Sequence, residues 1–288
     1  MKKLIEKKPK RLFAFGCSFT EYKWATWANI LAYDFDCEFY NFGKSGAGNT
    51  YITNQITQAN NYFKFNKDDL VIVSWTNISR EDRWSSTKGW VTPGNIYSQQ
   101  DYDQNFVRYW ANDIHFALRD FSNIDLVKKY LESTTNYHFL SMCDITKQIN
   151  QWEDISKQTN TQIESIIELY QDSLNCILPS FYDVLWSGDI DKKWQKDWKE
   201  IHPHYSDGHP TILEHYKYLN SVFDYDFSER TKKAVENLFS EWVDYIRQGY
   251  KNTRRSCGLH DMPTHWTDGI YDRFRLKIEE PIPAQLFH

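Results

Sequence analysis

The sequence has few cysteines and no long apolar run, and each absence narrows the possible functions. Its five cysteines include no CxxC pair, which argues against a zinc knuckle or a dithiol redox motif. Their odd number and wide spacing are typical of reduced thiols in a cytosolic protein. No stretch reaches the roughly 18 apolar residues that a membrane-spanning helix needs. We therefore expect a cytoplasmic protein without a membrane span.

An excess of positive charge is also missing. The formal net charge is -5, which argues against a general nucleic-acid-binding protein. The amino-terminal segment 1–11 is basic, but only a short apolar run follows it, from Leu12, and this run leads into the candidate site described below. A signal peptide would remove that site when it is cleaved, so we expect none.

Aromatic residues are abundant, at 17% of the chain with 12 tryptophans. They fill the core as bulky side chains, or some of them form exposed platforms for sugars. The sequence leaves both interpretations open. A length of 288 residues suits one large α/β domain with insertions, or one domain with a small appendage.

Strands and helices are expected to alternate in the first 80 residues. Three short apolar runs, each followed by a polar residue or glycine, predict buried parallel strands. Three such strand–helix units predict an α/β fold with a three-layer, doubly wound parallel sheet. The expected strands are 12–17, 38–42 and 70–75, and the expected helices are 24–35 and 49–63.

The remainder of the chain is expected to be mainly helical. We expect a main domain over 1–225, with a helical and irregular insertion at about 78–205 beside the active-site mouth. Residues 226–288 are expected to form a carboxyl-terminal helix and an extended tail that pack on the same domain. The tail carries three prolines and is a candidate contact for an oligomer or particle partner. The expected segments are an irregular stretch at 78–112, helices at 113–131, 137–152, 161–175, 210–222 and 228–250, a strand or buried segment at 176–185, and a loop at 186–205.

Three polar or glycine positions follow strand ends, where ligands bind in doubly wound sheets. They are Ser18, Gly46 and Asn77. Ser18 lies in the turn Gly16-Cys17-Ser18-Phe19-Thr20, which can expose its hydroxyl as a nucleophile. Alone, this turn fits a helix cap equally well. We interpret Cys17 as a small buried residue and not as the nucleophile.

A second polar segment, Ser206-Asp207-Gly208-His209-Pro210, lies far downstream. A histidine between glycine and proline is held in a tight turn, and Asp207 is near enough to orient its imidazole. The alternative is a polar surface loop. The order Ser18, Asp207, His209 is compatible with a catalytic triad, although triads are recognised by geometry.

Together these segments resemble the SGNH/GDSL hydrolase family. The resemblance covers about 11–80 and 203–222, and it implies a flavodoxin-like fold without a metal or other cofactor. It also implies Ser18 as nucleophile, His209 as base, Asp207 as the group orienting it, and an oxyanion hole formed by Ser18 N–H, Gly46 N–H and the Asn77 side chain. Four blocks occur in family order: Gly16-Cys17-Ser18-Phe19-Thr20, Asn41-Phe42-Gly43-Lys44-Ser45-Gly46, Ser74-Trp75-Thr76-Asn77 and Asp207-Gly208-His209-Pro210.

The sequence departs from the family pattern at three places. Cys17 replaces the usual aspartate before the serine, and Trp75-Thr76-Asn77 stands where Gly-x-Asn is usual, which crowds the oxyanion hole. The family aspartate lies three residues before the histidine, where this chain has Ser206. Either Asp207 reaches His209 through a rebuilt turn, or a backbone carbonyl orients His209 in a Ser–His dyad. We favour Asp207.

Other residues are weaker candidates for substrate contact or metal binding. Arg80 and Trp75 are candidate substrate contacts, and Arg80 either belongs to a solvated turn or binds an acidic substrate group. A histidine group could suggest a metal site, but the spacing from 209 to 215 does not place both on one helix face and no carboxylate motif accompanies it. We expect no metal. The group consists of His202, His204, His209 and His215.

These observations predict a serine esterase or deacylase that acts through an acyl-Ser18 intermediate, on an O-acylated carbohydrate or a similar small ester. A sugar O-acyltransferase would use the same groups. A different alternative is a binding or structural module, for example of a viral particle, that keeps the fold with weak catalysis.

Overall fold

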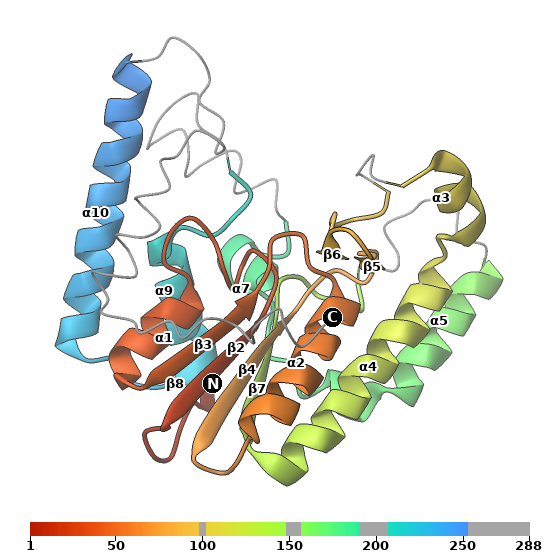
Figure 1. The fold of residues 1–288 in the computed structure, drawn as a ribbon, viewed down its shortest axis with the longest axis horizontal. Coiled ribbons are helices and arrows are strands. Elements are labelled where there is room, and N and C mark those ends of the chain that lie inside the picture. The colour runs from red at the N-terminus through yellow and green to blue at the C-terminus, as the bar shows by residue number, and fades with distance from the viewer. Residues whose placement is uncertain (98–101, 148–156, 190–206, 253–288) are drawn as a thin grey trace.

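A four-stranded parallel sheet forms the centre of the protein (Figure 1). The computed structural model describes residues 1–97, 102–147, 157–189 and 207–252. The strand order is β3-β2-β4-β7, which is 2-1-3-4 in chain order among these four and matches the flavodoxin-like doubly wound arrangement. The predicted fold class is therefore confirmed. The strands are β2 (Arg11–Gly16), β3 (Glu38–Gly43), β4 (Asp69–Trp75) and β7 (Asn136–Ser141).

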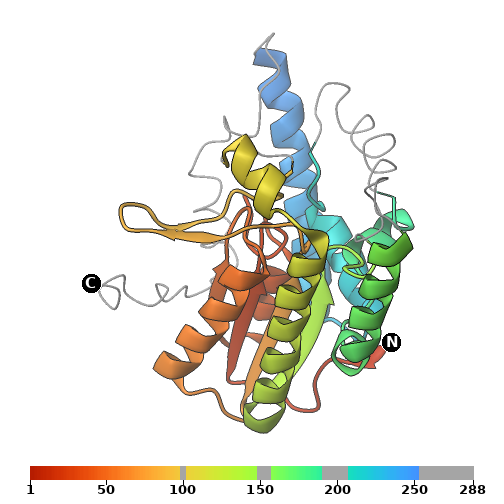
Figure 2. The same ribbon diagram turned by 90° about the vertical axis from the view of Figure 1, so that its right-hand side faces the viewer.

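Helices cover both faces of the sheet and complete the three layers (Figures 1 and 2). On one side α1, α9 and α10 pack against one another, and on the other side α2 packs against α4, which also contacts α5 and α6. The short α7 packs against α9. The helices are α1 (Trp27–Phe35), α2 (Asn49–Phe63), α4 (Asp113–Thr134), α5 (Lys157–Leu169), α6 (Gln171–Leu174), α7 (Phe181–Trp186), α9 (Ile212–Val222) and α10 (Glu229–Asn252).

Much of the aromatic content fills the core. Phe13 stacks on Tyr40 with ring centroids 4.9 Å apart, and Phe15 stacks on Phe42 at the same distance. Each pair joins residues that are partners in the β2–β3 register, so the rings extend the backbone ladder as cross-strand contacts. All seven residues of β4 are buried, as a strand between two helical layers requires. Among the described residues, four tryptophans are fully buried: Trp24, Trp27, Trp75 and Trp242.

Smaller elements lie outside the central sheet. The hairpin of β5 (Arg83–Ser85) and β6 (Gly89–Val91) and the helix α3 (Gln104–Trp110) lie beyond the carboxyl ends of the strands (Figure 1). They expose aromatic rings, since Trp84 is 52% exposed and Trp110 is 71% exposed. At the other end, β1 (Lys2–Lys3) pairs with β8 (Phe223–Asp224).

The structure corrects three predicted elements. The segment 176–185 was expected to be a strand or buried segment, but the helix α7 begins at Phe181. The stretch 78–112 was expected to be irregular, but it contains the β5–β6 hairpin and α3. Residues 137–152 were expected to form a helix, but 136–141 form β7, the fourth strand of the sheet. A short apolar run cannot be assigned to a strand or a helix from periodicity alone, and here pairing with β4 decides it. Because β7 and the preceding α4 belong to the main layers, the predicted insertion at 78–205 is not one continuous unit. The predicted loop at 186–205 and the tail lie largely outside the described residues.

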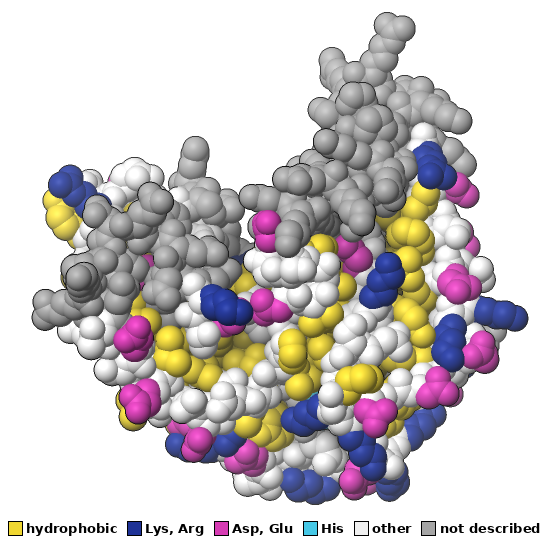
Figure 3. All heavy atoms as spheres, turned by 180° about the vertical axis from the view of Figure 1, so that it is seen from behind, with side chains coloured by type: hydrophobic (Ala, Val, Ile, Leu, Met, Phe, Trp, Pro, Cys, Tyr) yellow, Lys and Arg dark blue, Asp and Glu magenta, His cyan; other side chains and the backbone are white. Residues whose placement is uncertain are grey.

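The surface carries charges of both signs. Figure 3 shows Lys and Arg interspersed with Asp and Glu along the lower rim, the edge at the amino ends of the strands. Ion pairs account for part of this pattern, including Lys10 with Asp68 at 2.6 Å. Among the helices that the structure describes, none combines the length and the apolar character needed to cross a membrane.

Candidate active site

Ser18 lies in a tight turn directly after β2. The backbone N–H groups of Thr20 and Glu21 both donate to the carbonyl of Cys17, at 2.8 and 3.2 Å. A Cβ atom at Gly16 would lie 2.1 Å from Thr20 Oγ1 and 3.0 Å from the Ser74 carbonyl oxygen, so a larger residue would require its neighbours to shift. The helix-cap interpretation of Ser18 is wrong, since α1 begins at Trp27 and its N-cap is Thr26.

A chain of hydrogen bonds connects Ser18, His209 and Asp207. Ser18 Oγ lies 2.8 Å from His209 Nε2, and His209 Nδ1 lies 2.6 Å from Asp207 Oδ1. An ionised carboxylate only accepts, so Nδ1 carries the proton that faces Asp207, and Nε2 is left to accept from the Ser18 hydroxyl. The three side chains therefore have the connectivity that a nucleophile, a base and an orienting carboxylate would need.

The short spacing between Asp207 and His209 is accommodated by an Asx-type turn. Asp207 Oδ1 accepts from the backbone N–H of His209 at 2.8 Å as well as from the ring. One oxygen thus fixes both the main chain and the side chain of the histidine. The structure brings together the two residues that we favoured over a Ser–His dyad, while Ser206 lies outside the described residues.

Tyr22 is a site residue that the sequence did not indicate. Its ring stacks on the His209 imidazole at 3.8 Å between centroids and 18° between planes, and its hydroxyl donates to Asp207 Oδ2 at 2.9 Å. The neighbouring Trp24 donates from Nε1 to the Pro210 carbonyl at 2.8 Å. These contacts span more than 180 residues, so no local sequence pattern could have revealed them.

The predicted oxyanion donors follow three adjacent strands. In the described parts of the chain, the backbone N–H groups of Ser18 and Gly46 have no hydrogen-bond acceptor. The Asn77 Oδ1 atom accepts from Ser79 N–H at 2.7 Å, which turns the Nδ2 donor away from that contact and leaves it without an acceptor there. Donors without a partner in the described part of the protein are available to bind a substrate oxyanion.

Close packing shapes the loop around Gly46. Its φ angle is +74°, a region that favours glycine, and a Cβ atom there would lie 2.0 Å from the carbonyl oxygen of Thr92. The preceding block also contributes, since Asn41 Nδ2 donates to the Thr20 carbonyl at 3.2 Å. Two of the family-like blocks are thus joined directly by a side chain.

The two candidate substrate contacts have other surroundings. Trp75 is completely buried and packs edge-on against Phe139, so its position does not fit contact with a substrate. Arg80 donates from one terminal nitrogen to the Ala47 carbonyl at 2.8 Å, and the other lies 3.4 Å from Met142 Sδ. The guanidinium therefore joins neighbouring loops.

The histidine group and Cys17 were the other candidate groups. Among the described residues, no group of three or more His, Cys, Asp or Glu side chains could hold a metal ion. His202 and His204 lie outside those residues, and His215 is buried between Phe19 and Phe181. Cys17 is fully buried, as expected for a residue that packs at the end of a strand.

Comparisons with known proteins found matches among solved structures. No protein-family model matches the chain, and no curated protein matches it significantly. One similar structure is a member of the lipolytic protein G-D-S-L family from Veillonella parvula, with 12% identity, a TM-score of 0.38, and coverage of 73% of this chain and 96% of the other. A GDSL-like lipase from Bacteroides thetaiotaomicron has 15% identity, a TM-score of 0.38, and coverage of 81% and 91%. An alpha/beta hydrolase enzyme from the metagenome of Lake Arreo, Spain, has 12% identity, a TM-score of 0.39, and coverage of 74% and 92%. At identities and TM-scores this low, the geometry around Ser18 is the stronger guide to function.

Proposed function

We propose that this protein is a serine hydrolase of the SGNH type, an esterase or deacylase that works through an acyl-Ser18 intermediate. The observation that carries the proposal is the unbroken series of contacts from Ser18 Oγ to His209 Nε2 and from His209 Nδ1 to Asp207, at 2.8 and 2.6 Å. Both distances are hydrogen-bond distances, so Ser18 can pass its proton to His209 while Asp207 orients the imidazole and stabilises its positive charge.

The reaction follows from these positions. His209 Nε2 takes the hydroxyl proton while Ser18 Oγ attacks the ester carbonyl carbon, and the N–H groups of Ser18 and Gly46 with Asn77 Nδ2 bind the resulting oxyanion. The imidazolium then gives its proton to the departing alcohol, which leaves an acyl-Ser18 ester. Water attacks this ester with His209 again acting as base, and release of the acid restores the free serine.

For the substrate we propose an O-acylated carbohydrate or a similar small ester. Exposed aromatic rings beyond the carboxyl edge of the sheet support a sugar moiety, since Trp84, Tyr109 and Trp110 are 52%, 70% and 71% exposed. Rings presented in this way offer apolar faces with polar edges to a ligand. Transfer of the acyl group to a sugar hydroxyl would use the same Ser18 chemistry with a different acceptor.

Active-site labelling tests the proposal. We expect the wild type to hydrolyse p-nitrophenyl acetate and to react with a fluorophosphonate probe, with peptide mass spectrometry locating the probe on Ser18. Ser18→Ala should abolish both signals, while Cys17→Ala should retain them because the thiol is buried. A wild type that neither turns over ester nor labels would favour the binding or structural module instead.

A further inference from the structure

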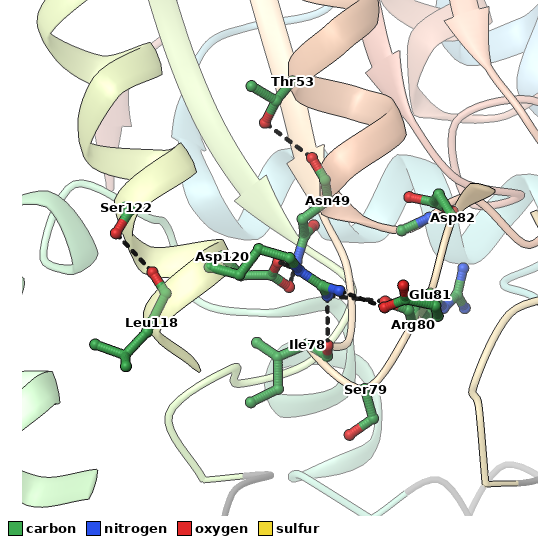
Figure 4. Close-up of polar contacts among 12 residues, drawn as sticks. Asn49, Thr53, Ile78, Ser79, Arg80, Glu81, Asp82, Leu118, Asp120 and Ser122 are labelled. Atoms are coloured by element: carbon green, nitrogen blue, oxygen red, sulfur yellow. Dashed lines mark hydrogen bonds and ion pairs between the residues drawn. The ribbon is translucent and has the colours of Figure 1, made fainter. Parts of the chain in front are cut away.

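The loop that carries Asn77 is held by side chains from two helices. We name residues 76–82, which follow β4, the β4 loop. Figure 4 shows it beside Asn49 of α2 and Asp120 of α4, with Asp120 lying between the helices and the loop. Asp120 is fully buried, and Asp82 and Glu81 are 5% and 7% exposed. A buried carboxylate destabilises the folded state unless it is paired, so the hydrogen-bond partners of these three side chains matter for the structure of the loop.

Asn49 holds the residue that precedes Asn77. Its Oδ1 atom accepts from the Thr76 N–H and its Nδ2 atom donates to the Thr76 carbonyl, both at 3.0 Å. The same Nδ2 group also donates to Asp120 Oδ2 at 2.7 Å. A single amide side chain thus fixes the backbone of Thr76 on both sides and connects it to α4.

Arg119 holds the residues that follow Asn77. One terminal nitrogen donates to the carbonyls of Ile78 and Arg80, at 3.0 and 2.8 Å, and the other donates to Glu81 Oε2 at 2.6 Å. Its Nε atom donates to Asp120 Oδ1 at 2.7 Å. The planar guanidinium can reach all four acceptors at once, which the single nitrogen of lysine cannot do.

The β4 loop in turn holds the loop that carries Gly46. Asp82 accepts from the N–H groups of Gly48 and Tyr51, both at 2.8 Å, and Arg80 donates to the Ala47 carbonyl at 2.8 Å. The backbone on both sides of Asn77 is therefore connected, through a few side chains, to the backbone directly after Gly46. Two of the three proposed oxyanion donors belong to one bonded unit.

We propose that Arg119 is a positioning residue that holds Asn77 and Gly46 in place to stabilise the oxyanion. This inference rests on the proposed function at Ser18. Arg119 does not contact Ser18, His209 or Asp207, so it acts through the two loops. Oxyanion donors must lie within a few tenths of an ångström of their best positions to be fully effective, and loops alone rarely hold side chains to that tolerance.

Arg11 provides a matched control. It donates to both oxygens of Asp69 at 2.7 and 2.6 Å and to the carbonyls of Phe63 and Lys64 at 3.2 and 3.3 Å. The exposed fraction of its side chain is 19%, against 17% for Arg119. Arg11 begins β2 at the amino end of the sheet, opposite the site. Arg11→Gln and Arg119→Gln therefore each disrupt a guanidinium that makes four hydrogen bonds to carboxylates and carbonyls, at opposite ends of the fold.

The test compares ester hydrolysis and hydrogen exchange in the wild type and in these two variants. We expect Arg119→Gln to lower kcat by about 10- to 100-fold with KM within about threefold, because the lost stabilisation belongs to the transition state. Amide exchange should become faster in 44–51 and 76–82. Arg11→Gln should lose similar thermal stability and keep kcat within about threefold. Arg119→Lys, which keeps the charge without the fork, should fall between wild type and Arg119→Gln.

Two results would overturn the inference while the proposed function stands. One is an equal loss of kcat in Arg119→Gln and Arg11→Gln, which would mean general destabilisation. The other is unchanged exchange in both loops of Arg119→Gln. If Arg119→Gln does not fold, Arg119→Lys decides by the same two measurements. A wild type that neither hydrolyses ester nor labels at Ser18 refutes the proposed function, and the positioning role in catalysis fails with it.

Discussion

The contact between Tyr22 and Asp207 gives the most direct prediction about catalysis. Tyr22→Phe removes the hydroxyl that donates to Asp207 Oδ2 at 2.9 Å, and it leaves in place the ring that stacks on His209 at 3.8 Å. Asp207 is 2% exposed, so little solvent can replace the lost donor. Of its hydrogen bonds to described residues, the carboxylate then keeps the two to His209.

The expected magnitude follows from the kind of bond. A hydrogen bond to a charged group contributes about 1.5–3 kcal/mol. At about 1.4 kcal/mol per factor of ten, full expression of this loss in the transition state would lower kcat/KM by about 10- to 100-fold. Because the stacked ring still restrains His209, we expect Tyr22→Phe near the lower value. Tyr22→Ala also removes the stacked pair, worth about 0.5–1.5 kcal/mol, and should be slower by a further factor of about three to ten.

The assay is kcat/KM for p-nitrophenyl acetate, with the rate of fluorophosphonate labelling as a second measure of Ser18 reactivity. Tyr225→Phe is a suitable control, because Tyr225 also donates its hydroxyl to a carboxylate, Asp34 Oδ2, at 2.5 Å. That pair joins the carboxyl-terminal part of α1 to the segment before α10. Equal kcat/KM in wild type and Tyr22→Phe, or an equal loss in Tyr225→Phe, would refute the positioning role of the Tyr22 hydroxyl.

Three further predictions concern single positions. Gly46→Ala should lower kcat by at least about tenfold and lower the melting temperature, because it combines φ +74° with a Cβ atom 2.0 Å from Thr92 O. The control Gly89→Ala, with φ +67° and its nearest neighbour at 3.8 Å, should lower only the melting temperature. Equal kcat in the two variants would contradict this prediction. Asp207→Asn should lower kcat by about 10³- to 10⁴-fold, since an amide no longer selects the imidazole tautomer whose Nε2 accepts from Ser18, and a loss below about tenfold would favour a Ser–His dyad. Burial lowers the pKa of His138 to about 4 from its ordinary 6.5, so the folded state binds fewer protons than the unfolded state between those values and loses stability as the pH falls through them. His138→Gln can still donate to the Leu4 carbonyl. Urea unfolding should show that this variant loses less stability than wild type between pH 7 and 4, by up to about 3 kcal/mol. Equal losses of stability in the two proteins over this pH range would refute the prediction.

The sequence predicted those parts of the site that depend on local chain geometry. The turn after β2, the glycine at position 46 and the tight turn around His209 each show in a few consecutive residues, since backbone conformation restricts which residues fit. The three strands of the first 80 residues were found from short apolar runs that end at a polar residue or a glycine. A short run such as Tyr137-His138-Phe139-Leu140 has no such marker, and its pairing with β4 had to come from the structure.

The residues that support the site could not be found in this way. Tyr22 reaches Asp207 across 185 positions, Asn49 reaches Asp120 across 71, and Arg119 reaches Glu81 across 38. Each lies in a segment whose local pattern indicates only a turn or a helix. Charged and amide side chains on a helix are usually solvated, so burial and partner choice, which depend on packing of the whole domain, identify their role.

Neighbouring side chains accommodate two departures from the family pattern, and the contacts between Ser18, His209 and Asp207 are kept. Trp75 was expected to crowd the oxyanion hole, but its ring is fully buried in the core against Phe139. Asp207, one residue closer to His209 than in the family, uses one oxygen for both the backbone and the ring of the histidine. Its other oxygen would then lack a donor, and Tyr22 supplies one. The short spacing and the tyrosine therefore act together: Asp207 reaches the imidazole through its turn, and Tyr22 contacts both the carboxylate and the imidazole.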